Sequence, residues 1–493
     1  MSFAMVSSRA ALGLHAPEVQ VEVHLSQGLP ALTIVGLAEA AVRESKDRVR
    51  SAIINSGFDF PSRRLTINLA PADLPKDGAR LDLPIALGIL AASGQLDNNA
   101  LNGYEFVGEL ALNGELRPIQ GVLAVARASH SAQRALLVPL QNGAEAARIP
   151  NAVIYGASSL KQVCDHLQGL ACLPVVHCQS VIHIESLPDM ADVRGQHRAR
   201  RALEIAAAGA HSLLFSGSPG TGKTLLASRL PSILPRLSDD EALEVASLYS
   251  IANQSINFGQ RPFRAPHHTA SAAALVGGGS QPRPGEISLA HYGVLFLDEL
   301  PEFDRKVLEV LRQPLESKEV VISRAARQLT FPANFQLIAA MNPCPCGYAF
   351  DGSQRCKCSP DMISRYRGRL SGPLLDRIDL HVEVPALPAS DLQSKTAGEA
   401  SAPIRQRVIA ARQQQITRQG VTNAALGPQL LDQFADLGVE QQKIIQMAQQ
   451  RLNLSARGYH RVLRVARTIA DLAQRDSIET SHLTEALSYR GQV

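Results

Sequence analysis

The stretch HSLLFSGSPGTGKTLLASRL, residues 211–230, constrains the fold of this chain more than any other. It carries the spacing G-x-x-x-x-G-K-T between an apolar strand-like run and a helical run, which is the context that a phosphate-binding loop requires. Glycines let backbone N–H groups surround a phosphate, and the following lysine reaches the β- and γ-phosphates. The pattern therefore predicts an α/β nucleotide-binding core. The predicted ATP-binding residues are Gly217, Ser218, Pro219, Gly220, Thr221, Gly222, Lys223 and Thr224.

An acidic pair follows the next long apolar run. HYGVLFLDEL, residues 291–300, ends that run in Asp298 and Glu299. We expect Thr224 and Asp298 to hold Mg²⁺ and Glu299 to orient and polarise the attacking water. Two acids after an apolar run more often mark a strand that leads into a helix cap, but the preceding phosphate loop favours the catalytic interpretation.

Three further polar residues occur in the order found in AAA+ ATPases. Asn342 ends the strand-like run FQLIAAM and is predicted to act as sensor 1 beside the γ-phosphate. Arg377 is predicted to be an arginine finger, with a surface salt bridge as the alternative. Arg457 is the predicted sensor 2, with Arg461 and Arg464 as alternatives. A finger that serves a neighbouring subunit requires a ring, so we expect a homohexamer.

The chain is expected to fold as three regions. Residues 1–168 mix short β-like runs with helical stretches, and 169–190 have the irregular polarity of a linker. Residues 191–386 alternate strands and helices as an α/β ATPase core does. Residues 387–493 begin with a linker rich in Pro, Ser and Ala and continue with the periodicity of a helical lid.

The composition excludes several classes of protein. No apolar run approaches the ~20 residues that a membrane span needs. The N-terminus lacks a basic start followed by an apolar core, so we expect no signal peptide and a cytoplasmic location. A formal charge of +4 over 493 residues is too small to indicate a nucleic-acid partner by itself.

Several longer stretches carry a more specific resemblance. Residues 192–224, 263–303 and 370–385 resemble the magnesium-chelatase-like ATPases of the YifB/ComM type, and the resemblance extends over nearly the whole chain. It implies a bacterial cytoplasmic protein with an AAA+ core of the helix-2-insert clade. In that clade an insert, here drawn from 263–291, and a hairpin, here drawn from 316–335, project into the pore of the ring.

The resemblance also implies a function in natural transformation. ComM-type members are ATP-dependent helicases that drive branch migration of incoming DNA, so we expect single-stranded and branched DNA as sequence-independent partners, and recombination proteins as further partners. Lys318, Arg324 and Arg327 in the expected hairpin would track phosphates. A solvated hairpin face is the alternative for these cations. Rival functions are a chelatase-like or chaperone motor that remodels a protein, and a scaffold in which ATP controls only assembly.

Four of the seven cysteines lie in one short segment, MNPCPCGYAFDGSQRCKCSP. Two C-x-C pairs separated by nine residues favour a structural zinc site over plain reduced thiols, although the usual spacing is C-x₂-C. The predicted ligands are Cys344, Cys346, Cys356 and Cys358.

The N-terminal region resembles Lon-type proteases at Pro75–Gly78, but its catalytic residues are missing. The Lon motif places a serine nucleophile where this chain has Arg80, and a lysine base where it has Leu123. A serine–lysine site requires both groups. We therefore predict a Lon-like α+β domain without peptidase activity, which mediates ring assembly or contacts DNA.

Overall fold

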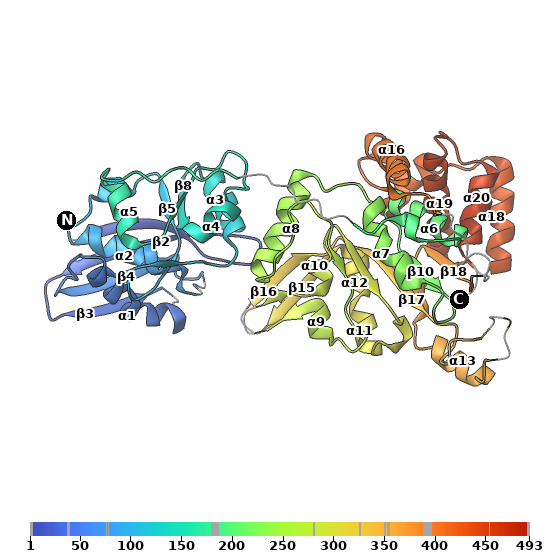
Figure 1. Cartoon of the computed structure of the whole chain (residues 1–493), viewed down its shortest axis with the longest axis horizontal. Helices are drawn as coiled ribbons and strands as arrows, with labels where there is room; N and C mark the ends of the chain where they lie inside the picture. Colours follow the sequence, from blue (N-terminus) through green and yellow to red (C-terminus); the bar gives the residue numbers. More distant parts are fainter. Residues whose placement is uncertain are drawn as a thin grey trace. The chain divides into compact units, whose positions relative to one another are not determined.

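The computed structural model of the chain describes residues 3–36, 40–74, 76, 78–178, 187–279, 282–324, 327–349, 352, 355–387, 397–452 and 454–490 (Figure 1). The chain divides into two compact units. The first contains Met1–His183 and Asp239–Phe258, and the second contains Ile184–Ser238 and Gly259–Val493.

A four-stranded sheet in the order β1-β2-β4-β3 forms one layer of the first unit. Apolar residues alternate along β2 and β4 because successive side chains of a strand point to opposite faces. Helix α2 (Asp82–Ala92), all of whose residues are buried, covers the apolar face. A β-carbon at Gly88 would lie 2.6 Å from Val23 Cγ2, so helix and sheet approach closely there. The strands are β1 (Phe3–Arg9), β2 (Glu18–Ser26), β3 (Ala31–Val35) and β4 (Arg64–Ala70).

The rest of the first unit contains a parallel sheet in the order β5-β8-β9 and a short antiparallel pair, β6 and β7. These strands are β5 (Tyr104–Phe106), β6 (Glu109–Leu110), β7 (Leu116–Arg117), β8 (Ala135–Pro139) and β9 (Ile154–Ala157). The remaining helices before the second unit are α1 (Ala40–Asn55), α3 (Val122–Ser131), α4 (Leu140–Ala146) and α5 (Leu160–Leu167).

Helix α8 (Asp239–Ile251) belongs to the first unit although it lies between two stretches of the second in the sequence. Its Leu243 and Ala246 join an apolar cluster with Val125 of α3. The backbone N–H of Gly121 donates to Ser250 Oγ at 3.1 Å. The predicted core, 191–386, includes this helix by sequence position, whereas its packing assigns it to the N-terminal unit.

The second unit is built on a five-stranded parallel sheet in the order β11-β14-β17-β10-β18. Strands β14 and β17 are buried at every position, which explains their continuous apolar sequences. Strand β10 lies in the interior of the sheet, between β17 and β18. The strands are β10 (Leu213–Ser216), β11 (Phe263–Arg264), β14 (Val294–Leu297), β17 (Gln336–Met341) and β18 (Leu380–Glu383).

The expected insert and hairpin lie between strands of this sheet. The expected insert, 263–291, begins with β11 and therefore includes one strand of the central sheet itself. The 316–335 segment forms an antiparallel hairpin of β15 (Glu319–Arg324) and β16 (Arg327–Pro332) directly before β17. The other elements here are α9 (Ala272–Val276), β12 (Gly277–Gly278), β13 (Arg283–Pro284), α10 (Glu286–Leu289), α11 (Arg305–Val310), α12 (Arg312–Ser317), α13 (Pro360–Arg367) and α14 (Gly372–Leu375).

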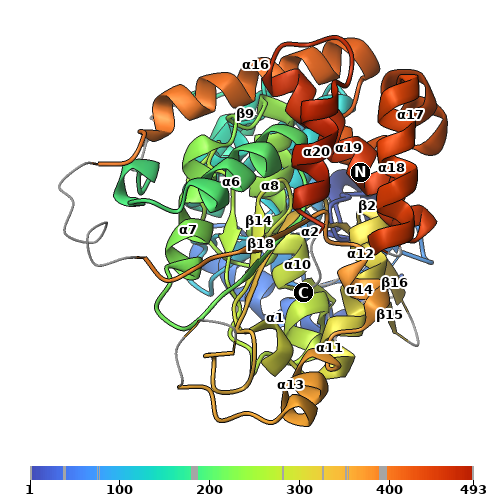
Figure 2. The same ribbon diagram turned by 90° about the vertical axis from the view of Figure 1, so that its right-hand side faces the viewer.

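The C-terminal helices share one hydrophobic core with the sheet and with α6 and α7. Figure 2 shows these C-terminal helices, α16 to α20 in orange and red, together in one group. The mixed α/β core with a helical C-terminal region fits an AAA+ magnesium-chelatase-like fold. These helices are α6 (His197–Gly209), α7 (Lys223–Ile233), α16 (Ser401–Gln419), α17 (Pro428–Phe434), α18 (Val439–Leu452), α19 (Ala456–Leu472) and α20 (Thr480–Ser488).

Parts of the two expected linkers, 179–186 and 388–396, lie outside the described residues. Among the residues that the structure does describe, none of the helices is both long and apolar enough to span a bilayer.

Candidate nucleotide site

The predicted phosphate loop connects β10 to α7, as its sequence context requires. Gly222 precedes α7 with φ of 90°, a conformation that favours glycine. Gly217 lies so close to the neighbouring backbone that a β-carbon there would be 2.3 Å from the carbonyl oxygen of Val384. Larger residues at these positions would deform the loop.

Lys223 is held inside this loop. Its ammonium group donates to the carbonyl oxygens of Gly217 at 2.6 Å and Ser218 at 2.9 Å, and to Asn342 Oδ1 at 3.1 Å. Burial lowers the pKa of Lys223, while the carboxylates of Asp298 and Glu299 oppose that shift. Asn342 follows β17, the strand beside β10, so the structure brings the predicted sensor 1 to the predicted phosphate-binding lysine.

Thr224 and Asp298 meet at the same edge of the sheet. The Thr224 hydroxyl donates to Asp298 Oδ2 at 2.7 Å, and the backbone N–H of Glu299 donates to Asp298 Oδ1 at 2.9 Å. A hydroxyl and a carboxylate that converge in this way are the hard oxygen ligands that Mg²⁺ takes beside a bound phosphate. The two predicted ligands therefore fit a magnesium ion.

Glu299 has a partner that the sequence analysis missed. His268 Nδ1 lies 3.1 Å from Glu299 Oε2, and Glu299 has a positive φ of 52°. His268 comes shortly after β11, and β11 pairs in parallel with β14, which precedes Glu299. Residues that follow two parallel neighbouring strands emerge at one edge of the sheet. That rule, applied to the pair His267-His268, is the signal that could have placed His268 in the site.

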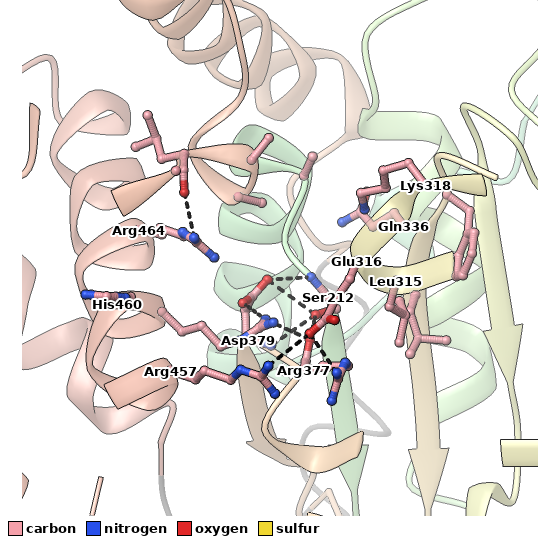
Figure 3. Close-up of a pocket in the computed structure, with 18 residues that line it drawn as sticks. Ser212, Leu315, Glu316, Lys318, Gln336, Arg377, Asp379, Arg457, His460 and Arg464 are labelled. Carbon is pink, nitrogen blue, oxygen red and sulfur yellow. Dashed lines mark hydrogen bonds and ion pairs between the residues drawn. The ribbon is translucent and has the colours of Figure 1, made fainter. Parts of the chain in front are cut away.

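Arg377 and Arg457 lie together at the amino ends of the strands, whereas Lys223 and Asp298 follow the carboxyl ends. Arg377 Nη2 contacts Glu316 Oε1 at 2.6 Å, and Arg457 Nη2 lies 3.5 Å from the same oxygen. Both line a cavity of about 480 Å³ together with Ser212 and Gln336 (Figure 3). Ser212 precedes β10 and Gln336 begins β17, so the cavity lies at the amino ends of the strands. Lys223, in contrast, follows the carboxyl end of β10, which is roughly 13 Å long at ~3.3 Å per residue.

The Arg377 backbone is fixed by a buried ion pair. Arg461 Nη1 donates to the Arg377 carbonyl oxygen at 2.7 Å and also pairs with Asp379. Burial alone would raise the pKa of Asp379, but Arg461 and hydrogen bonds from His211 and Ser212 hold it well below its usual range. In this structure Arg461 therefore contacts the protein itself, through the Arg377 carbonyl oxygen and Asp379.

The three cations of the expected hairpin do not lie at one place. Lys318 is at the base of the hairpin and lines the same cavity as Arg377. Figure 3 shows Lys318 across that cavity from Arg464 of α19. Arg324 and Arg327 pair with each other at the far end of the hairpin, and their side chains lie outside the described part of the chain.

The four clustered cysteines follow Asn342 directly, and their sulfur atoms all lie within 4.8 Å of one another. They contribute no atom to the phosphate loop. Their geometry matches the donor set that the sequence predicts.

At the two positions where the Lon motif places a serine nucleophile and a lysine base, this chain has neither group. Arg80 Nη2 donates to the Gln120 carbonyl oxygen at 3.2 Å, and Leu123 is buried in α3. Lys76 is buried and donates to the carbonyl oxygen of Pro71. Pro75 and Asp77 of the motif lie outside the described residues.

Known families match almost the entire chain. A model described as magnesium chelatase subunit ChlI matches residues 189–392, one for subunit ChlI of Mg-chelatase matches 21–142, and one for the ChlI C-terminal region matches 398–490. Competence protein ComM of Haemophilus influenzae is 51% identical, with 100% of this chain and 98% of the relative covered. The uncharacterized protein YifB of Escherichia coli is 50% identical, with 99% and 97% covered. The chloroplastic magnesium-chelatase subunit ChlI of Nicotiana tabacum is 24% identical over 38% of this chain and 45% of its own length.

Proposed function

The chain belongs to the magnesium-chelatase-like family that includes YifB and ComM, and from this premise we propose that it is an ATP-driven hexameric motor that moves branched DNA. One observation carries the ATPase part of the proposal. The side chains of Lys223, Thr224 and Asp298 converge at the carboxyl ends of neighbouring parallel strands, together with Glu299 and Asn342. In open α/β sheets this edge is where ligands bind.

Each of these residues has a distinct task in ATP hydrolysis. The Lys223 ammonium would exchange its contacts with the Gly217 and Ser218 carbonyl oxygens for phosphate oxygens of ATP. Mg²⁺ held by Thr224 and Asp298 would neutralise charge on the phosphates. Glu299 would orient the attacking water, and His268 would hold the Glu299 carboxylate in place until ATP binds.

Arg377 and Arg457 would act on the ATP of a neighbouring subunit. They lie at the amino ends of the strands, away from the Lys223 of their own chain, and they share the carboxylate of Glu316. Arg377 Nε is buried, and it has no hydrogen-bond partner among the described residues. A second subunit that presented its nucleotide to this cavity would supply an anionic partner, which supports assembly into a ring.

The DNA part of the proposal rests on family membership and on the hairpin. One relative of the chain over its whole length is named as a competence protein, and we propose a role in natural transformation for this chain also. Single-stranded and branched DNA would pass the β15–β16 hairpin, contacting phosphates without regard to sequence. Recombination proteins are further proposed partners, and the cytoplasm is the proposed location.

A protein-remodelling motor is the second candidate function. Two of the matches favour it, because they are described as subunits of a magnesium chelatase and their descriptions do not mention DNA. In this alternative the same ATP site would drive a conformational change in a protein partner.

The decisive experiment is a branch-migration assay with the full chain and labelled three-strand and four-strand junctions. We expect strand exchange with ATP, and none with a non-hydrolysable analogue or with Glu299→Gln. A ring that hydrolyses ATP steadily but moves no strand overturns the DNA motor. Absence of any fluorescence anisotropy change on labelled single strands would, in addition, favour the protein-remodelling alternative.

A further inference from the structure

The cysteine segment has the dimensions of a mononuclear metal site. The Sγ atoms of Cys344 and Cys346 are 3.3 Å apart, those of Cys344 and Cys356 are 3.8 Å apart, and those of Cys346 and Cys356 are 3.6 Å apart. Cys358 completes the group, with all four sulfurs within 4.8 Å of one another.

These separations fit tetrahedral zinc better than the other states of four cysteines. Zinc–sulfur bonds of ~2.3 Å in a regular tetrahedron place the sulfurs about 3.8 Å apart. A disulfide would require a sulfur–sulfur distance of ~2.0 Å, and all four cysteines are free. A polynuclear iron–sulfur cluster would hold the thiolates farther apart than a single ion does. One ion with four thiolate ligands therefore accounts for the arrangement.

The backbone around the first cysteine pair is shaped to present both sulfurs to one point. Gly347 has a φ of 85°, and its N–H donates to the Cys344 carbonyl oxygen at 3.0 Å, which closes a tight turn. The N–H of Ala349 points to Cys344 Sγ at 3.3 Å. Such N–H donors offset negative charge on a metal-bound thiolate.

A second contact joins the two cysteine pairs outside the sulfur cluster. The guanidinium of Arg355, next to Cys356, lies 4.4 Å from the ring centroid of Tyr348, which follows the first pair. This cation–π contact holds the two arms of the loop together.

The turn also lies directly against the phosphate loop. A β-carbon at Gly347 would be 2.5 Å from Cδ of Pro219, so only glycine allows this approach. At its other end the segment begins with Asn342, which accepts a hydrogen bond from Lys223. The cysteine segment thus touches the nucleotide site at two places.

We propose that Cys344, Cys346, Cys356 and Cys358 bind one zinc ion, which clamps this segment against Pro219 and so holds Asn342 and the phosphate loop in register. The site is closed, because four thiolates leave no coordination position for water, so the ion is structural rather than catalytic. The metal part of this proposal is independent of the proposed DNA function. Its coupling part rests only on nucleotide binding.

The first test is elemental analysis of the full chain, purified without chelator. We expect close to one zinc per chain, and loss of that zinc in the double variant Cys356→Ser/Cys358→Ser. The matched control is Cys172→Ser/Cys178→Ser, which replaces two exposed cysteines outside the cluster and should keep its zinc. Metal well below one per wild-type chain, or equal metal in both double variants, overturns the site.

A second measurement covers the case in which the cysteine variants fail to fold. Wild-type chain, stripped of zinc and loaded with Co²⁺, should show the visible and thiolate charge-transfer absorption of a tetrahedral four-sulfur site. Zinc added afterwards should abolish that spectrum. A spectrum of octahedral cobalt, or no spectrum, contradicts four-thiolate ligation.

The coupling is tested by the affinity for a fluorescent ATP analogue. Zinc-stripped chain should bind it several-fold more weakly than the native chain, and re-addition of zinc should restore the affinity. The same treatment of Cys172→Ser/Cys178→Ser controls for damage by the chelator. Unchanged affinity after complete zinc loss overturns the coupling while leaving the metal site in place.

Discussion

The chain contains two stretches that read as active-site motifs, and their surroundings in the structure are opposite. In the stretch that resembles the Lon motif, Arg80 donates to a backbone carbonyl oxygen, and the buried Asp82 accepts a hydrogen bond at Oδ2 from Arg48 Nε at 2.8 Å. In the phosphate loop, Lys223 and Thr224 face side chains from two other strand ends, Asn342 and Asp298. A short motif alone does not make an active site, because catalysis needs several groups that converge on one space.

The largest expected difference between the two motifs is in nucleotide binding. Lys223→Ala should abolish ATP binding and turnover, because the ammonium is the group that reaches the phosphates. Arg80→Ala should leave both unchanged. Steady-state ATPase assays and binding of a fluorescent ATP analogue measure the two effects. Loss of ATP turnover in folded Arg80→Ala protein would show that the N-terminal motif also contributes to the ATPase reaction.

The second prediction tests whether one nucleotide site is formed by two subunits, with Arg377 contributed by the neighbour. Arg377→Ala should keep ATP binding but lose about 10³-fold in turnover, as removal of an arginine finger does. Mixing Arg377→Ala with Lys223→Ala chains should restore part of the activity, because some interfaces then combine an intact loop with an intact finger. Mixed rings that stay inactive at every ratio would place Arg377 in its own subunit's site.

The third prediction concerns stability and tests the ion pair of Asp379 with Arg461. Asp379→Ala should destabilise the second unit by about 3–5 kcal/mol, because Arg461 would lose its buried partner. The matched control is Arg369→Ala, since the pair of Arg369 and Glu302 is exposed and should contribute less than about 1 kcal/mol. Urea denaturation of both variants measures the difference. Equal losses of stability in the two variants would show that the pair of Asp379 and Arg461 does not hold the backbone at Arg377 in place.

The smallest predicted effect is a pH dependence of opposite sign in the two units. Burial outweighs Arg48 and raises the pKa of Asp82 to about 6. Its protonation should therefore stabilise the first unit by about 2 kcal/mol as the pH falls from 7 toward 4. The pKa of Asp379 is lowered, so its stabilisation is present above about pH 4 and is lost below it.

Hydrogen exchange of α2 amides between pH 7 and pH 5 measures the first of these effects. Asp82→Asn should remove the dependence, since an amide does not titrate in this range. Amides of α2 that become less protected as the pH falls from 7 to 5 would contradict the raised pKa.

Several features of the site could be predicted from local sequence. The phosphate loop, the acidic pair after β14 and Asn342 after β17 are each recognisable because a short motif is joined to a buried strand. The spacing of the cysteines predicts a four-sulfur cluster, and the structure confirms that the sulfurs lie together. Family membership also followed from the longer stretches.

Other features depend on contacts between segments that are distant in the sequence. His268 reaches Glu299 only because β11 lies beside β14, and α8 leaves the core because its apolar face packs against α3. Lys318 lines the same cavity as Arg377 and Arg457, although these three residues are far apart in the sequence. No local pattern encodes strand order or the partner of a helix face.

The sequence by itself therefore determined the family and which chemical groups are present for a candidate nucleotide site. The tertiary structure decided how these groups are divided, with Lys223 at one edge of the sheet and Arg377 and Arg457 at the other. The physical reason is that a parallel sheet has two distinct ends. A motif records the residues near one strand end, whereas the strand order and the packing of the helices determine which other residues meet there.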